Sequence, residues 1–407
     1  MGKSESISVH AIPRSIWLLG FVSLLMDVSS EMIHSLLPVF LVTTLGASAL
    51  AVGAVEGIAE ATALITTVFS GSLSDWLGRR KGLAVLGYAL GAASKPFFAL
   101  AASVSWVAGA RFVDRIGKGI RGAPRDALVA DLASPEIRGA AFGLRQSLDT
   151  VGAFLGPLMA IALMVWLAGD FRAVFWFAVF PAALAVLLLA LGIEEPAPKA
   201  AKGAISPIRW SSVTGMGRAY WRVVAIGALF TLARFSEAFL ILRAQQLGLP
   251  DVYAPTVLIV MNVVYAASAY PFGKLSDTVS SRKLLALGIC VLVGADLILA
   301  TVSGLAAIAV GVGLWGLHMG VTQGLLAKMV ADAAPAALRG TAFGFFNLAS
   351  GATMLAASVL AGALWDLYGA PVTFYCGGGL ALLALAWLLA DINVGIIRQP
   401  QEPERKP

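Results

Sequence analysis

The stretch GSLSDWLGRRKGL, residues 71–83, is a short charged segment between two long apolar runs. It returns in degenerate form as GKLSDTVSSRK at residues 273–283. The matching glycines and aspartates of the two copies are 202 residues apart, and a second motif, RGAAFG at 138–143, returns as RGTAFG at 339–344 after 201 residues. Two unrelated motifs with nearly one offset indicate a duplicated half, because a period near 200 residues is far too long for a solenoid repeat.

Each copy of the charged segment predicts a tight turn between two membrane helices. Glycine lets backbones approach and turn, aspartate accepts hydrogen bonds from a helix N-terminus or an arginine, and the basic residues stay on the cytoplasmic side. A simple basic anchoring turn is the alternative interpretation. The residues assigned to this conformational-switch loop are Gly71, Asp75, Gly78, Arg79, Arg80, Gly273, Asp277 and Arg282.

Composition indicates a membrane protein that crosses the bilayer many times. Of 407 residues, 59% are hydrophobic and 13% charged, and the mean hydropathy is +0.85. The net charge of +6 comes from basic residues in short loops, where they set membrane orientation, so no nucleic-acid partner is expected. Cys290 and Cys376 form no disulfide or metal-binding pattern, and no cofactor is expected.

Twelve apolar runs are long enough to span roughly 30 Å of hydrocarbon, at about 20 residues each. We expect an all-α polytopic fold with two pseudo-symmetric six-helix bundles, residues 1–193 and 223–392, a cytoplasmic linker at 194–222 and a disordered cytoplasmic tail at 393–407. The alternating loops rich in Lys and Arg place both termini in the cytoplasm. The predicted spans are 16–43, 50–72, 82–102, 105–127, 139–166, 172–193, 223–246, 254–275, 283–303, 306–331, 341–365 and 370–392.

The first two spans carry ionisable residues that an apolar membrane would exclude. Asp27, Glu31 and His34 share one helix face, and Glu56 and Glu60 share a face of the next span. Each ionised group costs at least about 2.5 kcal/mol at the bilayer centre, so these faces must line a cavity or be paired. A proton-binding cluster, a divalent-metal site at Asp27, Glu31 and His34, and structural pairing with arginines of the fourth span are all compatible with the pattern.

The fourth and fifth spans carry two further patterns. In the fourth, Asp114 and Arg115 lie among several basic residues, and Arg115 is close enough to the midplane to need a carboxylate partner. In the fifth, Gly143, Gly152, Gly156 and Pro157 place small residues on one stripe, which favours close helix packing, with a proline bend.

Together these motifs resemble the major facilitator superfamily over essentially the whole chain. Residues 71–81 resemble its loop between helices two and three, and RIGKGIRGA, residues 115–123, resembles its helix-four motif, with Lys118 replacing Gln and Arg121 replacing Gly. The glycines and proline of the fifth span resemble the antiporter motif, with Ala160 and Ile161 in place of its last two glycines. The resemblance implies two rocking bundles around a central site, proton coupling through Arg115, and export.

Residues 26–38, 56–62 and 117–126 are similar to nickel-resistance efflux permeases, although the histidine-rich tail of such proteins is missing. We therefore expect a monomeric, non-enzymatic transporter in a bacterial inner membrane that exchanges protons for a small organic drug or metabolite, or for a divalent metal such as nickel. A non-transporting membrane sensor or scaffold with the same fold is the alternative.

Overall fold

The computed structural model describes residues 12–77, 80–134, 137–194, 216–335 and 338–393. All regular elements within these ranges are helical, which confirms the predicted all-α fold. Most of the predicted linker, 195–215, and nearly all of the predicted tail, 394–407, lie outside the described residues. Gly78 and Arg79 of the first charged turn also lie outside them.

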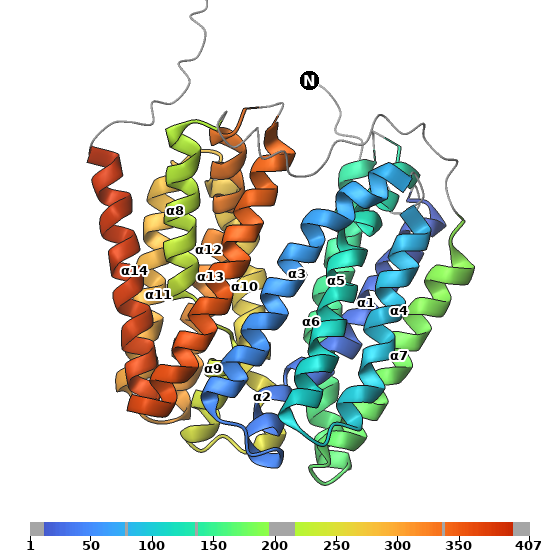
Figure 1. Cartoon of the computed structure of the whole chain (residues 1–407), viewed down its shortest axis with the longest axis horizontal. Helices are drawn as coiled ribbons and strands as arrows, with labels where there is room; N and C mark the ends of the chain where they lie inside the picture. The colour runs from blue at the N-terminus through green and yellow to red at the C-terminus, as the bar shows by residue number, and fades with distance from the viewer. Residues whose placement is uncertain (1–11, 78–79, 135–136, 195–215, 336–337, 394–407) are drawn as a thin grey trace, which may run out of the picture.

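Two groups of helices stand side by side (Figure 1). We call the end at which α1 begins and α14 ends the terminal end, and the opposite one the far end. The first half comprises α1 (Arg14–His34), α2 (Leu37–Val39), a π-helical turn (Phe40–Thr44), α3 (Ala49–Leu77), α4 (Arg80–Ala99), α5 (Val104–Leu132), α6 (Arg138–Trp166) and α7 (Phe171–Gly192). The second comprises α8 (Arg218–Ala233), α9 (Ala238–Gln246), a 3-10 turn (Asp251–Tyr253), α10 (Thr256–Leu275), α11 (Ser281–Thr301), α12 (Leu305–Ala333), α13 (Arg339–Tyr368) and α14 (Ala370–Asn393).

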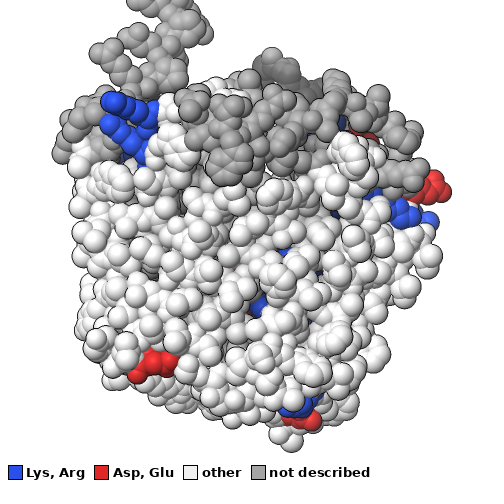
Figure 2. All heavy atoms as spheres, in the orientation of Figure 1, with Lys and Arg blue, Asp and Glu red and all other residues white. Residues whose placement is uncertain are grey.

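Ten helical segments of the described chain are long and apolar enough to cross a membrane. The two remaining long helices, α4 and α5, have 20 and 29 residues, enough to cross at 1.5 Å per residue, but they carry buried charged side chains. Figure 2 shows one face on which uncharged side chains cover the middle, while most visible charged side chains lie near the two ends. The chain is therefore a multi-pass membrane protein.

Two spans predicted to be continuous are interrupted. The first, 16–43, divides after His34 because Pro38, in the first turn of α2, has no N–H to donate to the His34 carbonyl. The seventh, 223–246, divides between Ala233 and Ala238. There the Ser236 N–H donates to Ser358 Oγ of α13 at 3.2 Å, so a side chain of another helix replaces a main-chain acceptor.

The two halves share an apolar core only toward the far end. The larger buried cluster joins residues of both halves, and its members from the first half come from residues 28–55, 98–110 and 160–178, the middle and far parts of those helices. A separate cluster packs the terminal end of the first half by itself. The bundles are thus joined by a common core at the far end and packed separately at the terminal end.

Helices α3 and α13 make the closest contact between the halves. A methyl group placed on Gly53 of α3 would overlap the main-chain oxygen of Ser358 of α13, so only glycine allows this approach. At the far end, the Asp366 carboxylate of α13 accepts hydrogen bonds from the main-chain N–H groups of Ala49 at 3.0 Å and Leu50 at 2.9 Å. One bundle therefore caps the first turn of a helix in the other.

Asp366→Asn should weaken closure at the far end. Asparagine keeps one acceptor oxygen but loses the second acceptor and the negative charge at the helix N-terminus, which costs about 1 kcal/mol, roughly a fivefold change in the ratio of open to closed far ends. We expect spin labels on Thr44 and Leu367, in a background lacking Cys290 and Cys376, to show an increased population of long distances. Asp170→Asn is the matched control, because Asp170 caps α7 at 2.9 and 3.1 Å within one bundle. Equal distance distributions in both variants would contradict the assignment of Asp366 as a latch.

Candidate functional site

Helix α5 supplies a layer of buried cations that pair with carboxylates of α3. Arg111 Nη2 lies 2.8 Å from Glu56 Oε2, and both side chains are buried. One turn along, Arg115 Nη2 lies 3.1 Å from Glu60 Oε1. The carboxylate partner that the sequence requires for Arg115 is therefore Glu60, and two consecutive turns of α3 and α5 are joined by ion pairs.

Asp114 faces the other way, toward α4. Its Oδ1 accepts a hydrogen bond from Lys95 Nζ at 2.7 Å, and Lys95 also donates to Ser30 Oγ of α1 at 3.0 Å. Arg111 Nη1 lies 3.8 Å from the second Asp114 oxygen. Only 1% of the Lys95 side chain is exposed. Lys95 was not among the predicted site residues, yet it connects α1, α4 and α5.

His34 bridges the carboxylates of α1 and α3. Its Nδ1 lies 3.4 Å from Glu31 Oε2 and its Nε2 lies 3.6 Å from Glu56 Oε2. Since Glu56 also pairs with Arg111, these four side chains form one continuous polar network between α1, α3 and α5. A change in the protonation of Glu31 or His34 can therefore reach Glu56 through direct contacts.

Asp27 belongs to a different group, shared with α6. Its Oδ1 lies 4.0 Å from Arg121 Nη2, and it borders the same cavity as Asp149 of α6. Asp149 also faces Arg125 at 3.6 Å and Arg145 at 3.4 Å. Asp149 was not among the predicted site residues, because its position beside Asp27 depends on how α1 and α6 pack.

The Asp27 and Asp149 carboxyls line a cavity of about 430 Å³ between the two bundles. About a quarter of the Asp27 side chain is exposed, and a fifth of the Asp149 side chain. The wall combines polar groups with apolar side chains from α6 and α10. The other lining residues are Gln146, Thr150, Val151, Ala153, Phe154, Leu155, Asn262, Val263, Tyr265 and Ala266.

The predicted metal trio is not assembled. Within the described ranges, no three His, Cys, Asp or Glu side chains are grouped so as to hold a metal ion. His34 contacts Glu31 and Glu56, whereas Asp27 lies beside Arg121 and borders the cavity that Asp149 also lines. Asp27 and His34 share a helix face but are separated by about 10 Å along its axis, at 1.5 Å per residue.

The glycine stripe of α6 lies directly against the acidic face of α1. A methyl group on Gly152 would lie 3.0 Å from Asp27 Cβ, and one on Gly156 would lie 2.6 Å from Glu31 Cβ. Pro157 follows inside the same helix. A methyl group on Gly143, by contrast, would meet no heavy atom within 4 Å. Two of the three predicted glycines therefore set the distance between α1 and α6 beside the carboxyl groups.

The two charged turns are built differently. In the first, Gly71 lies against α5, where its methyl would be 3.4 Å from Ala123 Cβ, and Arg80 Nη1 lies 3.0 Å from Asp131 Oδ2 at the end of α5. In the second, a methyl on Gly273 would meet nothing within 4 Å. Asp277 and Arg282 lie in and just after the turn that joins α10 to α11. The ion pair of the first turn fastens α4 to α5.

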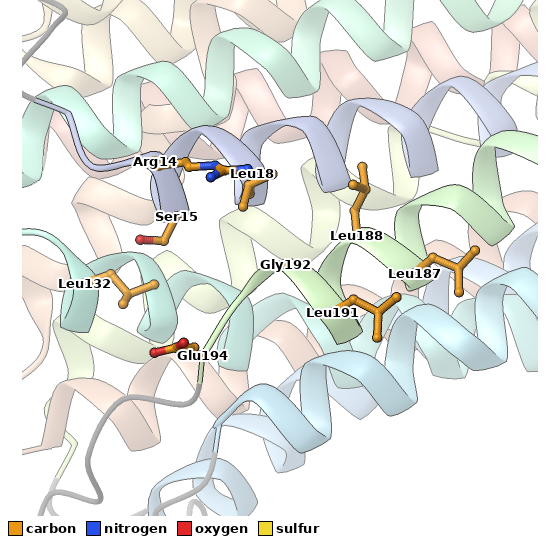
Figure 3. A pocket seen from close by; sticks show the side chains of 9 residues that line it. All are labelled: Arg14, Ser15, Leu18, Leu132, Leu187, Leu188, Leu191, Gly192 and Glu194. Carbon is orange, nitrogen blue, oxygen red and sulfur yellow. The ribbon is translucent and has the colours of Figure 1, made fainter.

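A second hollow opens at the terminal end of the first half (Figure 3). In this view the leucines of α7 lie on one side, and Arg14 and Glu194 toward the other. All its lining residues belong to the first half, so it is not part of a path between the bundles. They are Arg14, Ser15, Leu18, Leu132, Leu187, Leu188, Leu191, Gly192 and Glu194.

The family model of the Major Facilitator Superfamily matches residues 19–349 and 238–407 of this chain. The chain belongs to the Major Facilitator Superfamily. A curated member, an uncharacterized MFS-type transporter of Methanocaldococcus jannaschii, is 33% identical over 386 residues, covering 93% of this chain and 95% of that protein.

Other members match less closely. The multidrug resistance protein MdtH of Photorhabdus laumondii is 31% identical over 162 residues, 39% of each chain. Among solved structures, the nucleoside transporter NupG superposes with a TM-score of 0.79 at 12% identity, covering 92% of this chain and 99% of that one. This MFS transporter therefore shares its fold with a structurally known transporter, and its ionic network is placed in the first of the two MFS bundles.

Gly156→Ala should destabilise this MFS transporter by about 1–3 kcal/mol, because the new methyl group overpacks the contact with Glu31. Gly143→Ala is the matched control: it makes the same chemical change in the same helix, where space is open, and should be neutral or slightly stabilising. Thermal unfolding of the purified proteins in detergent tests the difference. Equal melting temperatures would show that the α1–α6 contact is not tight.

Lys95→Met should cost about 3–5 kcal/mol, since it leaves the buried Asp114 carboxylate without its closest partner. The double variant Lys95→Met/Asp114→Asn should recover part of this loss, and a double-mutant cycle measures the coupling. If the two single losses simply add, the pair is not a unit.

Proposed function

We propose that this MFS transporter is a proton-coupled exporter of a small organic solute. The observation that carries the proposal is the Asp27–Asp149 carboxyl pair, which lines a cavity between the bundles. Two carboxyls on the wall of one cavity disfavour a second negative charge, because neighbouring carboxylates repel. Asp149 faces Arg125 at 3.6 Å and Arg145 at 3.4 Å, whereas Asp27 has one guanidinium at 4.0 Å, so we assign proton binding to Asp27.

Exchange follows from competition at this pair. A cationic or hydrogen-bond-donating solute in the cavity favours the ionised form of Asp27, and proton binding removes the charge that attracts such a solute. Linkage then makes each ligand weaken the binding of the other by the same factor. Rocking of the two bundles exposes the pair alternately to the two sides, so a proton entering from one side exchanges for a solute leaving from the other.

The cavity wall favours an organic solute of moderate size. About 430 Å³ lies within the usual range for small-molecule pockets. Phe154 and Leu155 offer apolar surface, while Asn262 and Tyr265 of the second bundle offer hydrogen bonds. The multidrug resistance protein MdtH, which matches part of the chain, supports export of such compounds. The carboxylates of α3 are engaged by arginines, which disfavours a divalent metal as the cargo.

The direction of transport depends on how the protein is oriented in the membrane. The terminal end carries the basic turn around Arg80, which the positive-inside rule places in the cytoplasm. The terminal end, where the two bundles are packed separately, then faces the cytoplasm of a bacterial cell, with α1 beginning and α14 ending on that side, and the protein acts as a monomer in the inner membrane.

Inside-out vesicles with an acidic interior test this function. We expect added solute to release luminal protons in the wild type, using a panel of organic cations, followed by nickel, cobalt and zinc. Asp27→Asn and Asp149→Asn should each reduce this release by about tenfold or more, within the usual range of coupling free energies. Asp332→Asn, at an exposed carboxylate of α12 outside the cavity, is the control and should behave as the wild type.

Other results of the vesicle experiment would change or refute the proposal. Release caused by metals alone would replace the organic cargo with a cation. Release by organic compounds that persists in both cavity variants would refute the carboxyl pair as the coupling site. No release by any compound would favour the membrane sensor or scaffold.

A further inference from the structure

Asp296 is a buried carboxylate far from the ionic network of the first bundle. It lies in the middle of α11, its relative exposure is 0%, and neither of its oxygens has a hydrogen-bond partner among the described residues. A buried carboxylate without a donor is costly in hydrocarbon surroundings. Some positive species must therefore compensate for it, either from the protein or from solution.

The glycines of α14 place this carboxylate beside the break between α8 and α9. A methyl group on Gly377 would lie 3.1 Å from Asp296 Oδ2 and 3.3 Å from the carbonyl oxygen of Ala233. Ala233 is the last residue of α8, so this helix supplies no N–H donor to its carbonyl. The end of a helix also carries partial negative charge. Two acceptors of like polarity thus border the same glycine, and the Phe235 ring lies beside them.

The titratable groups of the break, of α9 and of the middle of α12 are Arg234, Glu237, Arg243 and His318, and the two ring nitrogens of His318 have no hydrogen-bond partner among the described residues. Arg234, in the break, lies 5.7 Å over the Phe230 ring. Arg243 of α9 donates to the Leu299 carbonyl at 2.9 Å, one turn beyond Asp296. His318 of α12 packs at right angles to Trp315. Within the described side chains of α14, up to Ala390, no residue is charged. No ion pair of Asp296 is formed by the described residues.

We propose that Asp296 and the carbonyl end of α8 form a binding site for a monovalent cation, H⁺ or Na⁺, in the second bundle. Unwound carbonyls and half-helix ends hold such ions in other transporters. This site is separate from the Asp27–Asp149 cavity, and the proposal does not depend on the identity of the exported solute.

Cation binding at this site can affect the contact between the two bundles. The break beside it continues into α9, where Phe239 packs against α3, 3.1 Å from a methyl group placed on Gly53. The same break is fastened to α13 through Ser236 and Ser358. A bound cation that fixes the end of α8 therefore stabilises the far-end closure, and its loss frees α9 to move.

Thermal unfolding of the full-length protein in detergent tests the proposal. It is measured from mildly acidic to alkaline pH, with sodium or with choline at constant ionic strength, for the wild type, Asp296→Asn and the control Asp332→Asn. If the occupant is H⁺, the wild-type melting temperature falls by a few degrees as pH rises, whichever salt is present. If it is Na⁺, sodium but not choline restores the loss at alkaline pH. Asp296→Asn should abolish either response, and Asp332→Asn should retain it.

Infrared spectroscopy provides a second readout that does not depend on the variant's stability. In an Asp27→Asn background, which removes the other carboxyl to which a proton is assigned, the carbonyl band of a protonated Asp296 should disappear as pH rises or sodium is added. The proposal is overturned if this band persists under all conditions, since the carboxyl then exchanges no cation. It is also overturned if Asp296→Asn keeps the wild-type response to pH and sodium.

Discussion

The ion pair between Arg111 and Glu56, 2.8 Å long and buried on both sides, sets the geometry of the first bundle. A buried charged side chain needs an oppositely charged partner at hydrogen-bonding distance, because burying it unpaired costs several kcal/mol of desolvation free energy. Arg111, Arg115 and Asp114 therefore fix the rotation and depth of α5 against α3 and α4. His34 extends the network to α1, and the glycines of α6 bring the cavity carboxyls together.

The two halves are stabilised by different kinds of interaction. Polar pairing holds the first bundle together around its ionisable groups, whereas the second is packed mainly through apolar and aromatic contacts, such as that of Phe235 with Phe374. The apolar core at the far end joins a bundle that is held together by ion pairs to a bundle that is held together by apolar contacts. A change of charge within the first bundle can therefore alter how that bundle fits against the second.

Much of the architecture was predictable because it follows from local patterns. The repeated charged turns and apolar runs gave the duplicated all-helical fold, and the position of Arg115 required the carboxylate that Glu60 supplies. Lys95 was missed because a single lysine near the end of an apolar run reads as an interfacial residue, and only packing shows that it is buried. No proline marks the break after Ala233 in the sequence. The break is stabilised by a hydrogen bond from the Ser236 N–H to Ser358, over a hundred residues away, so no local pattern could reveal it. Helical periodicity placed Asp27 and His34 on one face but ignored the rise along the axis.

The cap that Asp366 places on α3 has a consequence for how this protein can evolve. Its donors are the main-chain N–H groups of positions 49 and 50, not side chains. Any residue except proline supplies the same donor, so these two positions are free to vary while the carboxylate opposite them is held constant. Covariation between sequences, which detects pairs of side chains that change together, would leave this contact between the bundles unseen.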